Sequence, residues 1–204
     1  MVTDYVSDDS LEKIASEIIG CPLCKLSGSR KNAVPGEGQL SAKLLFIGEA
    51  PGKNEDEKGK PFVGAAGSIL STAMEKAGIK RSQVFITNLV KCRPPKNRIP
   101  DEDERTACRP YLERQISLIS PKMICILGST AYSSILDGKS ITTNRGKIVK
   151  RNGQKYFLTI HPAAAIYNTS LRAILENDLF KLAREIKKMD NTLKQSSLLE
   201  QEDI

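Results

Sequence analysis

Four cysteines are the residues of this chain with the clearest capacity for chemistry. Cys21 and Cys24 form a C-x2-C pair, and Cys92 and Cys108 follow with fifteen residues between them. Four thiolates can hold a zinc ion or an iron–sulfur cluster, and this uneven spacing fits a cluster at least as well as zinc. The fifth cysteine, Cys125, lies inside the apolar run MICILG, so we expect a buried core residue rather than part of a disulfide framework.

Three short motifs accompany these cysteines along the chain. GEAPG occupies residues 48–52, TNLVKCRPP occupies residues 87–95, and HPAAA occupies residues 161–165. The last motif begins with the single histidine of the sequence. A carboxylate, an amide and an imidazole are thus available for acid–base chemistry or for hydrogen bonding to a ligand.

The composition is that of a globular protein, with 204 residues, 40% hydrophobic and 27% charged. This length suits one domain with its own core. The N-terminal residues MVTDYVSDDS lack the pattern of a secretory signal peptide, and no apolar run reaches membrane-spanning length. We therefore expect a soluble, cytoplasmic protein with no membrane partner.

The formal net charge of +7 suits a polyanionic partner such as nucleic acid. Basic residues gather in two runs that contain no acidic residue: Lys91, Arg93, Lys96 and Arg98 around Cys92, and Arg145, Lys147, Lys150 and Arg151 further on. The first run favours phosphate contact, whereas for the second a solvated surface is an equally good interpretation.

Strand and helix patterns alternate along the chain. Strands are predicted at 43–47, 84–88, 123–127 and 156–160, and helices at 11–19, 67–77, 101–119, 129–136 and 171–189. The pattern predicts one three-layer α/β/α domain over residues 1–189, with a central, mainly parallel four-stranded sheet. Residues 190–204 are expected to form a polar, disordered tail.

Ligands of such folds bind at the carboxyl ends of the parallel strands. Glu49, Asn88, Ser129 and His161 all fall at the carboxyl ends of predicted strands: Asn88 is the last residue of its strand, and the other three follow theirs within two residues. We therefore expect these four residues to gather at one edge of the sheet.

Taken together, GEAPGKNED, GKPFVGAAG, ITNLVKCRPPKNR, HPAA and the four cysteines resemble the iron–sulfur-containing family 4 uracil-DNA glycosylases of bacteria and archaea. The resemblance extends from Cys21 to about Asn168. It implies a base excision repair enzyme that flips uracil out of single- or double-stranded DNA, hydrolyses its N-glycosidic bond and leaves an abasic site. It also implies a monomer with a structural [4Fe–4S] cluster held by Cys21, Cys24, Cys92 and Cys108.

The resemblance assigns the catalytic roles to two residues. Glu49 would orient or deprotonate the attacking water, although family 1 enzymes carry their acidic residue one position later, where this chain has Ala50. His161 would donate a hydrogen bond from a neutral ring to uracil O2 as negative charge builds there. The alternative for Glu49 is a carboxylate that caps the following turn.

Four further residues are assigned by the resemblance to the base pocket. Gly48 would lie against the base and Phe62 would stack on it, whereas Asn88 would read N3–H and O4. Glu55 would guard the C5 side of the base and exclude the methyl group of thymine. A core position for Phe62 and a turn position for Asn88 are the alternatives.

DNA contacts are expected from three segments. Ser129 and Thr130 would bind a phosphate at a helix start, or only cap that helix. Lys91 and Arg93 of the first basic run would contact phosphates. Ile166 or Tyr167 would wedge into the gap left by the flipped nucleotide, or only pack against the domain.

Two other functions stay open on the sequence alone. One is a catalytically inactive, nucleic-acid-binding iron–sulfur relative, and the other is a zinc-stabilised enzyme that acts on free nucleotides. A sliding-clamp or other replication partner for the polar tail is a further open question.

Overall fold

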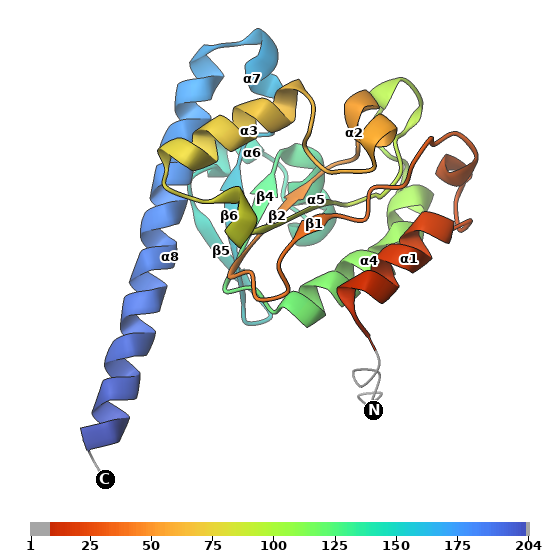
Figure 1. The fold of residues 1–204 in the computed structure, drawn as a ribbon. Helices are drawn as coiled ribbons and strands as arrows, with labels where there is room; N and C mark the ends of the chain where they lie inside the picture. The colour runs from red at the N-terminus through yellow and green to blue at the C-terminus, as the bar shows by residue number, and fades with distance from the viewer. Residues whose placement is uncertain (1–8, 203–204) are drawn as a thin grey trace.

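The computed structural model describes residues 9–202 of the chain, with side chains up to residue 191, and has a six-stranded sheet at its centre (Figure 1). The strand order is β1-β3-β2-β4-β6-β5. Their bounds are Glu37–Gly38 (β1), Leu44–Gly48 (β2), Phe85–Asn88 (β3), Met123–Leu127 (β4), Ile148–Arg151 (β5) and Gln154–Thr159 (β6).

The four strands predicted from the sequence form the parallel centre of this sheet, as expected. The prediction of only four strands was wrong, because β1 and β5 add one antiparallel strand at each edge. β1 has two residues, too few for a periodic pattern, and β5 lies in the second basic run. Asn152 and Gly153 turn the chain from β5 into β6, and both have positive φ, as the hairpin signal in the sequence indicated.

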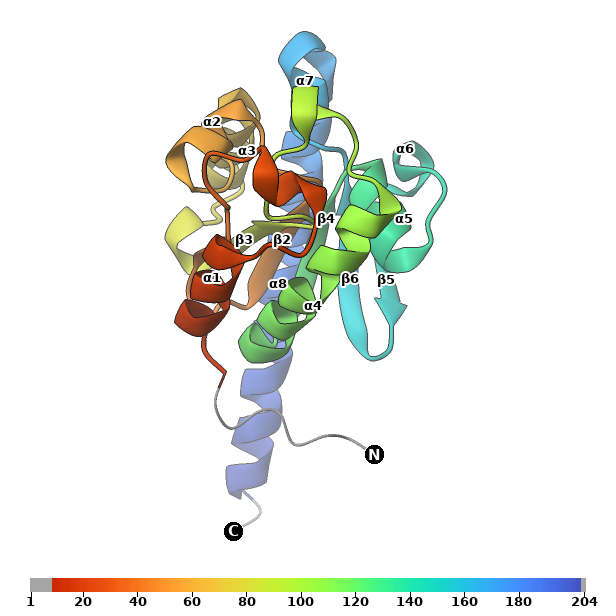
Figure 2. The ribbon, with the colours of Figure 1, turned by 90° about the vertical axis from the view of Figure 1, so that its right-hand side faces the viewer.

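Helices cover both faces of the sheet, which confirms the three-layer architecture (Figures 1 and 2). One face packs against α3 (Ala65–Lys76) and α8 (Ser170–Glu202). The other packs against α4 (Glu102–Ile119), α5 (Ser129–Leu136) and α6 (Ile141–Asn144). Both faces are apolar because β2 and β4 are buried along their whole length, as is typical of parallel strands.

A smaller layer lies beside this core. Helix α1 (Leu11–Gly20) packs its buried residues Ile14 and Ile18 against α4 and the segment after β3. Gly20 ends this helix as the sequence predicted, so Cys21 follows immediately. Short helices complete the fold: η1 (Lys25–Gly28), α2 (Lys53–Lys58), η2 (Arg81–Gln83), η3 (Pro95–Asn97) and α7 (Ala164–Tyr167).

The sequence predicted the start of α4 but not the end of α8. The capping box of Asp101 and Glu104 that the sequence predicted is formed at the start of α4. At the other end of the chain, α8 runs past Asp190, where we expected a disordered tail, and continues to Glu202. Asp190 itself is held by hydrogen bonds from Lys43 and Lys122. Helix α8 therefore extends well beyond the body of the domain (Figure 1).

No helix within residues 9–202 is both long enough and apolar enough to span a membrane.

Candidate active site and cysteine centre

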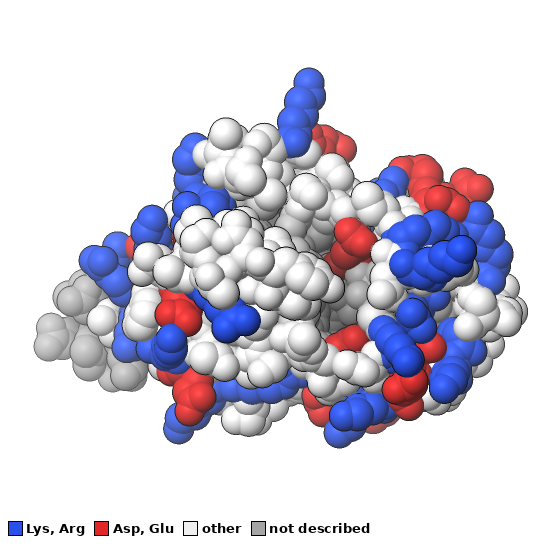
Figure 3. Space-filling model, turned by 90° about the horizontal axis from the view of Figure 1, so that it is seen from above, with Lys and Arg blue, Asp and Glu red and all other residues white. Residues whose placement is uncertain are grey.

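A cavity of about 460 Å³ opens at the carboxyl ends of the parallel strands, where the sequence placed the site. Its volume lies in the usual range for small-molecule sites. Six of the predicted residues line it: Glu49, Glu55, Phe62, Asn88, His161 and Ile166. The face that carries α3 and α7 shows a hollow near its centre, with Lys and Arg side chains on both flanks and acidic side chains among them (Figure 3).

Gly48 and Asn88 are direct neighbours across the inner end of this cavity, because β2 and β3 pair them in register. The Asn88 side chain is only 1% exposed. Its Oδ1 atom has no hydrogen-bond partner within the described part of the chain. A buried amide oxygen without a donor is costly, so an atom of this kind in a ligand-sized cavity indicates that a ligand supplies the donor.

Phe62 forms one wall of the cavity in an unusual backbone conformation. Its φ of 51° is rare for a bulky residue, and such strain is frequent at functional sites. The ring is 7% exposed and lies against His161, with 5.8 Å between the ring centroids. A Cβ atom on Gly48 would lie 2.7 Å from Phe62 Cζ and 2.4 Å from Asn88 Oδ1. Glycine at position 48 therefore keeps the space between these two side chains open.

The carboxylate of Glu55 fastens the loop that carries Phe62. Its Oε1 accepts hydrogen bonds from the backbone N–H groups of Val63 and Gly64, each at 2.8 Å. Its Oε2 accepts from the N–H of Gly52 at 3.1 Å. Glu55 thus lines the cavity and also holds together two of its walls.

His161 carries its proton on the nitrogen that is free to face a ligand. The backbone N–H of Ala163 donates to Nδ1 at 3.1 Å, so Nδ1 is an acceptor and the neutral ring bears its proton on Nε2. Burial lowers the pKa of His161 to about 4, against a smaller opposing effect of Glu55. The ring is therefore neutral at physiological pH. Gly128 allows its close approach, since a Cβ there would lie 2.8 Å from His161 Cβ.

Glu49 is the first residue after β2 and lines the same cavity, partly exposed. Its backbone carbonyl accepts from the N–H of Val90, so the chain after β3 runs alongside it. Among the contacts of the described residues, its side chain forms no hydrogen bond or ion pair. The carboxylate is therefore available to a ligand or a water molecule.

The rim of the cavity includes η3, from the first basic run. Lys96 and Asn97 both have a φ of 54°, and Asn97 accepts a hydrogen bond from Arg93 Nε. Arg98 is held in place by a bidentate ion pair with the buried carboxylate of Glu104. The sequence analysis named Arg98 only as a member of the first basic run and missed Asn97, although both lie within the motif KCRPPKNR and line the cavity.

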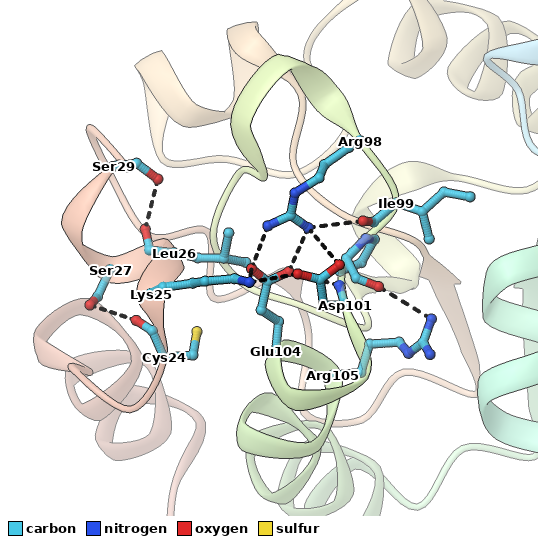
Figure 4. Close-up of polar contacts among 11 residues, drawn as sticks. Cys24, Lys25, Leu26, Ser27, Ser29, Arg98, Ile99, Asp101, Glu104 and Arg105 are labelled. Carbon is cyan, nitrogen blue, oxygen red and sulfur yellow. Dashed lines mark hydrogen bonds and ion pairs between the residues drawn. The ribbon is translucent and has the colours of Figure 1, made fainter.

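A single ion-pair network joins this rim to the cysteine segment (Figure 4). Lys25, directly after Cys24, donates to Asp101 at 2.6 Å, and Asp101 also lies 3.4 Å from Arg98. Lys25 is two-thirds exposed, so this ion pair is weak by itself. The buried Glu104 is the stronger anchor, because its Oε2 also accepts the N–H of Asp101.

The remaining predicted DNA contacts lie on or near the same face. Ile166 lines the cavity, and Tyr167 beside it in α7 is 94% exposed. Ser129 is exposed and Thr130 is partly buried at the start of α5, which Gly128 precedes without a side-chain cap. Arg93 is partly exposed.

Lys91 does not fit the predicted phosphate contact. Its side chain is 1% exposed, and its ammonium group donates to Thr87 Oγ1, Gln115 Oε1 and the carbonyl of Asn88. Burial lowers its pKa to about 8. The prediction for Lys91 was wrong because the side chain turns into the core instead of towards solvent.

The second basic run is also engaged within the domain. Arg145 forms a bidentate pair with the buried Asp178, and Arg151 pairs with Asp137. The structure thus favours the solvated-surface interpretation for this run.

The four predicted cysteine ligands come together beside α1. One small cavity is lined by all four: Cys21, Cys24, Cys92 and Cys108. Within the described residues, no three His, Cys, Asp or Glu side chains lie close enough together to bind one metal ion. Cys125 is fully buried elsewhere, in the core, as predicted.

Two N–H donors point at these sulfur atoms. Arg30 Nη1 lies 3.1 Å from Cys92 Sγ, and the backbone N–H of Lys91 lies 3.3 Å from Cys108 Sγ. Burial raises the pKa of the Cys108 thiol to about 11, so its thiolate needs a bound cation for stability. Hydrogen bonds to sulfur are a regular feature of iron–sulfur sites, and these residues fit such a group. The sequence analysis did not identify Arg30.

Comparison with known proteins agrees with this geometry. The family model described as the uracil DNA glycosylase superfamily matches residues 35–187. The chain is 56% identical to the type-4 uracil-DNA glycosylase of Sulfurisphaera tokodaii over 87% of this chain and 85% of the relative. The chain belongs to the type-4 uracil-DNA glycosylases. It is also 50% identical to the type-4 enzyme of Saccharolobus solfataricus, over 91% of this chain and 90% of the relative.

The similarity extends to a bacterial type-4 uracil-DNA glycosylase. The protein of Thermotoga maritima is 42% identical over 90% of this chain and 98% of the relative. The family-model range 35–187 contains all the residues that line the cavity, together with Cys92 and Cys108, whereas Cys21 and Cys24 precede it. The family resemblance expected from the motifs is therefore confirmed.

Proposed function

We propose that this protein removes uracil from DNA by hydrolysing the N-glycosidic bond, which releases free uracil and leaves an abasic site for base excision repair. The observation that carries this proposal is the partnerless Oδ1 of Asn88, buried in a cavity that Phe62, Glu49 and His161 also line. The type-4 uracil-DNA glycosylases to which the chain is similar support the same activity.

The cavity recognises a flipped uracil through shape and hydrogen bonds. Asn88 Oδ1 accepts from N3–H of the base, and its Nδ2 group donates to O4. Phe62 stacks on the base, and Gly48 leaves the space that the base edge needs. Cytosine presents the opposite pattern at N3 and N4, so it would leave the amide of Asn88 mispaired.

Two residues stabilise the charges that develop as the bond breaks. His161 donates from Nε2–H to uracil O2, and a neutral ring suffices because the leaving base is already anionic. Glu49 orients the attacking water and favours the cationic sugar. Glu55 holds the Phe62 loop by its backbone hydrogen bonds and presents its remaining surface to the C5 side of the base.

DNA binds across the face that Figure 3 shows, with the flipped nucleotide in the hollow. Arg93 at the η3 rim and Ser129 and Thr130 at the start of α5 contact phosphates. The exposed Tyr167, with Ile166 behind it, fills the gap left in the base stack.

The cysteine centre holds a [4Fe–4S] cluster through Cys21, Cys24, Cys92 and Cys108. When bound, the cluster supplies a structural cross-link between α1, the segment after β3 and helix α4. We also propose that the protein acts as a monomer inside the cell. Whether the C-terminal part of α8 contacts a sliding clamp is a question for pull-down with the full chain.

A glycosylase assay tests the activity. A 5′-labelled oligonucleotide with one uracil is incubated with the purified protein and then treated with alkali, which cleaves at abasic sites. We expect cleavage at uracil and none at cytosine or thymine in the same position. DNA binding without an abasic product would favour an inactive nucleic-acid-binding relative, and release of uracil from free deoxyuridine nucleotides alone would favour a nucleotide enzyme.

A further inference from the structure

Lys91 is the one lysine of the described residues that the core encloses completely. A buried ammonium group is destabilising unless all three of its N–H bonds find acceptors. Here they do, at 2.5 Å to Thr87 Oγ1, 2.8 Å to Gln115 Oε1 and 3.0 Å to the carbonyl of Asn88. All three hydrogen-bond acceptors are neutral, and the charge effect that opposes burial and raises the pKa of Lys91 comes from Cys108 of the cysteine centre.

Lys91 contacts both the base-reading residue Asn88 and the cysteine centre. On one side, its side chain binds the carbonyl of the base-reading residue Asn88. On the other side, its backbone N–H donates to Cys108 Sγ, and the next residue is Cys92. Lys91 therefore touches both the inner end of the uracil cavity and the cysteine centre.

The hydrogen bond to Asn88 fixes the backbone where β3 ends. The chain leaves the sheet here, and Leu89 N–H donates to Gly48 O while Val90 N–H donates to Glu49 O. The side chain of Lys91 then folds back over this turn to the Asn88 carbonyl. The backbone at Asn88 is thus held by β2 through the N–H of Leu89 and by Lys91 through the Asn88 carbonyl. This fixed backbone sets the direction in which the Asn88 side chain points.

Gln115 makes this arrangement rigid. Its Oε1 accepts from Lys91, and its Nε2 donates to the carbonyl of Pro35 at 2.7 Å. Thr87 Oγ1 also lies within hydrogen-bond distance of Pro35 O and Gln115 Oε1. The network joins β3, α4 and the loop before β1, all of them elements of the rigid core.

We propose that Lys91 is a positioning residue that aligns Asn88 for uracil recognition and transmits the placement of the cysteine centre to the base pocket. The proposal rests on the proposed function, since it deepens the role of Asn88. Lys91 touches no substrate atom, and it acts through the Asn88 backbone.

The Lys91→Met variant tests this proposal, because it keeps the length of the side chain and removes its three donors. We expect kcat/KM for uracil excision to fall at least about tenfold, since small misplacements of reacting groups have effects of that size or larger. Affinity for free uracil, measured by calorimetry, should fall in parallel, whereas affinity for abasic DNA and iron content should match the parent.

A double variant separates positioning from stability. Lys91→Met removes the ammonium donor to Gln115 Oε1 and leaves that oxygen only the longer contact with Thr87 Oγ1, at 3.3 Å. Lys91→Met/Gln115→Leu removes both partners of the lost hydrogen bond, which is often nearly neutral for stability. We expect the double variant to recover part of the lost thermal stability but none of the lost uracil affinity.

Two results would overturn the proposal. In the first, Lys91→Met with parental iron content binds free uracil and excises uracil as the parent does. In the second, uracil affinity recovers together with thermal stability in the double variant, which would make Lys91 a purely structural residue. A parent protein that neither binds nor excises uracil would instead refute the proposed function itself.

Discussion

Substitution of Gly48 by alanine probes the base pocket at its tightest point. A Cβ atom at this position would lie 2.4 Å from Asn88 Oδ1 and 2.7 Å from Phe62 Cζ. An ordinary carbon–oxygen contact is about 3.3 Å or longer. Asn88 or the new methyl group must therefore move by about 1 Å, and the methyl group would occupy the space assigned to the uracil edge.

The expected loss follows from that displacement. A misplacement of about 1 Å can lower a rate about 100-fold, which corresponds to about 2.7 kcal/mol in the activation free energy. Overpacking of the core should also lower the free energy of unfolding by about 1–3 kcal/mol. The fold should survive this change, because the strand pairing of β2 does not depend on the missing side chain.

Single-turnover excision from a uracil-containing oligonucleotide measures the effect. Gly28→Ala is the matched control, since a Cβ there meets nothing within 4 Å and Gly28 is exposed. We expect Gly28→Ala to behave as the parent and Gly48→Ala to lose about two orders of magnitude. A Gly48→Ala protein within about threefold of the parental rate would show that the base does not bind between Asn88 and Phe62.

Three other predictions concern catalysis and the cysteine centre. Glu49→Gln should slow single-turnover excision about 100-fold or more at unchanged affinity for uracil DNA, and a near-parental rate would remove Glu49 from the mechanism. Because the pKa of His161 is lowered to about 4, nitrogen NMR should show a neutral, Nε2-protonated ring down to about pH 5. Folding stability should fall as pH drops from about 6.5 towards 4, since the unfolded chain then binds the additional proton; an imidazolium at pH 6 would contradict the lowered pKa and the neutral ring. Protein purified without oxygen should be brown with about four irons per chain, and Cys125→Ser should keep them whereas Cys108→Ser should not; stoichiometric zinc in a colourless protein would exclude the cluster.

The sequence predicted the centre of the fold because its signals there are local. The apolar runs of β2 and β4 and the capping box at Asp101 each depend on a few adjacent residues. The edge strands β1 and β5 escaped prediction, since two residues form no pattern and a basic run resembles a solvated surface. The continuation of α8 past Asp190 was missed because the polar residues there show no apolar face.

The sequence also predicted only part of the candidate site. Asn88 ends β3 and His161 follows β6, so topology alone placed them at one edge of the sheet. The burial of Lys91 was not predictable, because it depends on acceptors supplied by Thr87 and, from a distant helix, by Gln115. Charge in a sequence does not report the direction in which a side chain turns.

The role of Asn88 is tested most directly by uracil excision with the Asn88→Asp variant under single-turnover conditions. The substitution removes the donor to O4 and leaves carboxylate oxygens, so a uracil anion would meet an unpaired O4 beside a negative charge. We predict a loss of about 2 kcal/mol or more in transition-state stabilisation, or about 30-fold in rate, with at most weak cytosine excision that rises as pH falls. Parental uracil excision with parental selectivity over cytosine would contradict base recognition by Asn88.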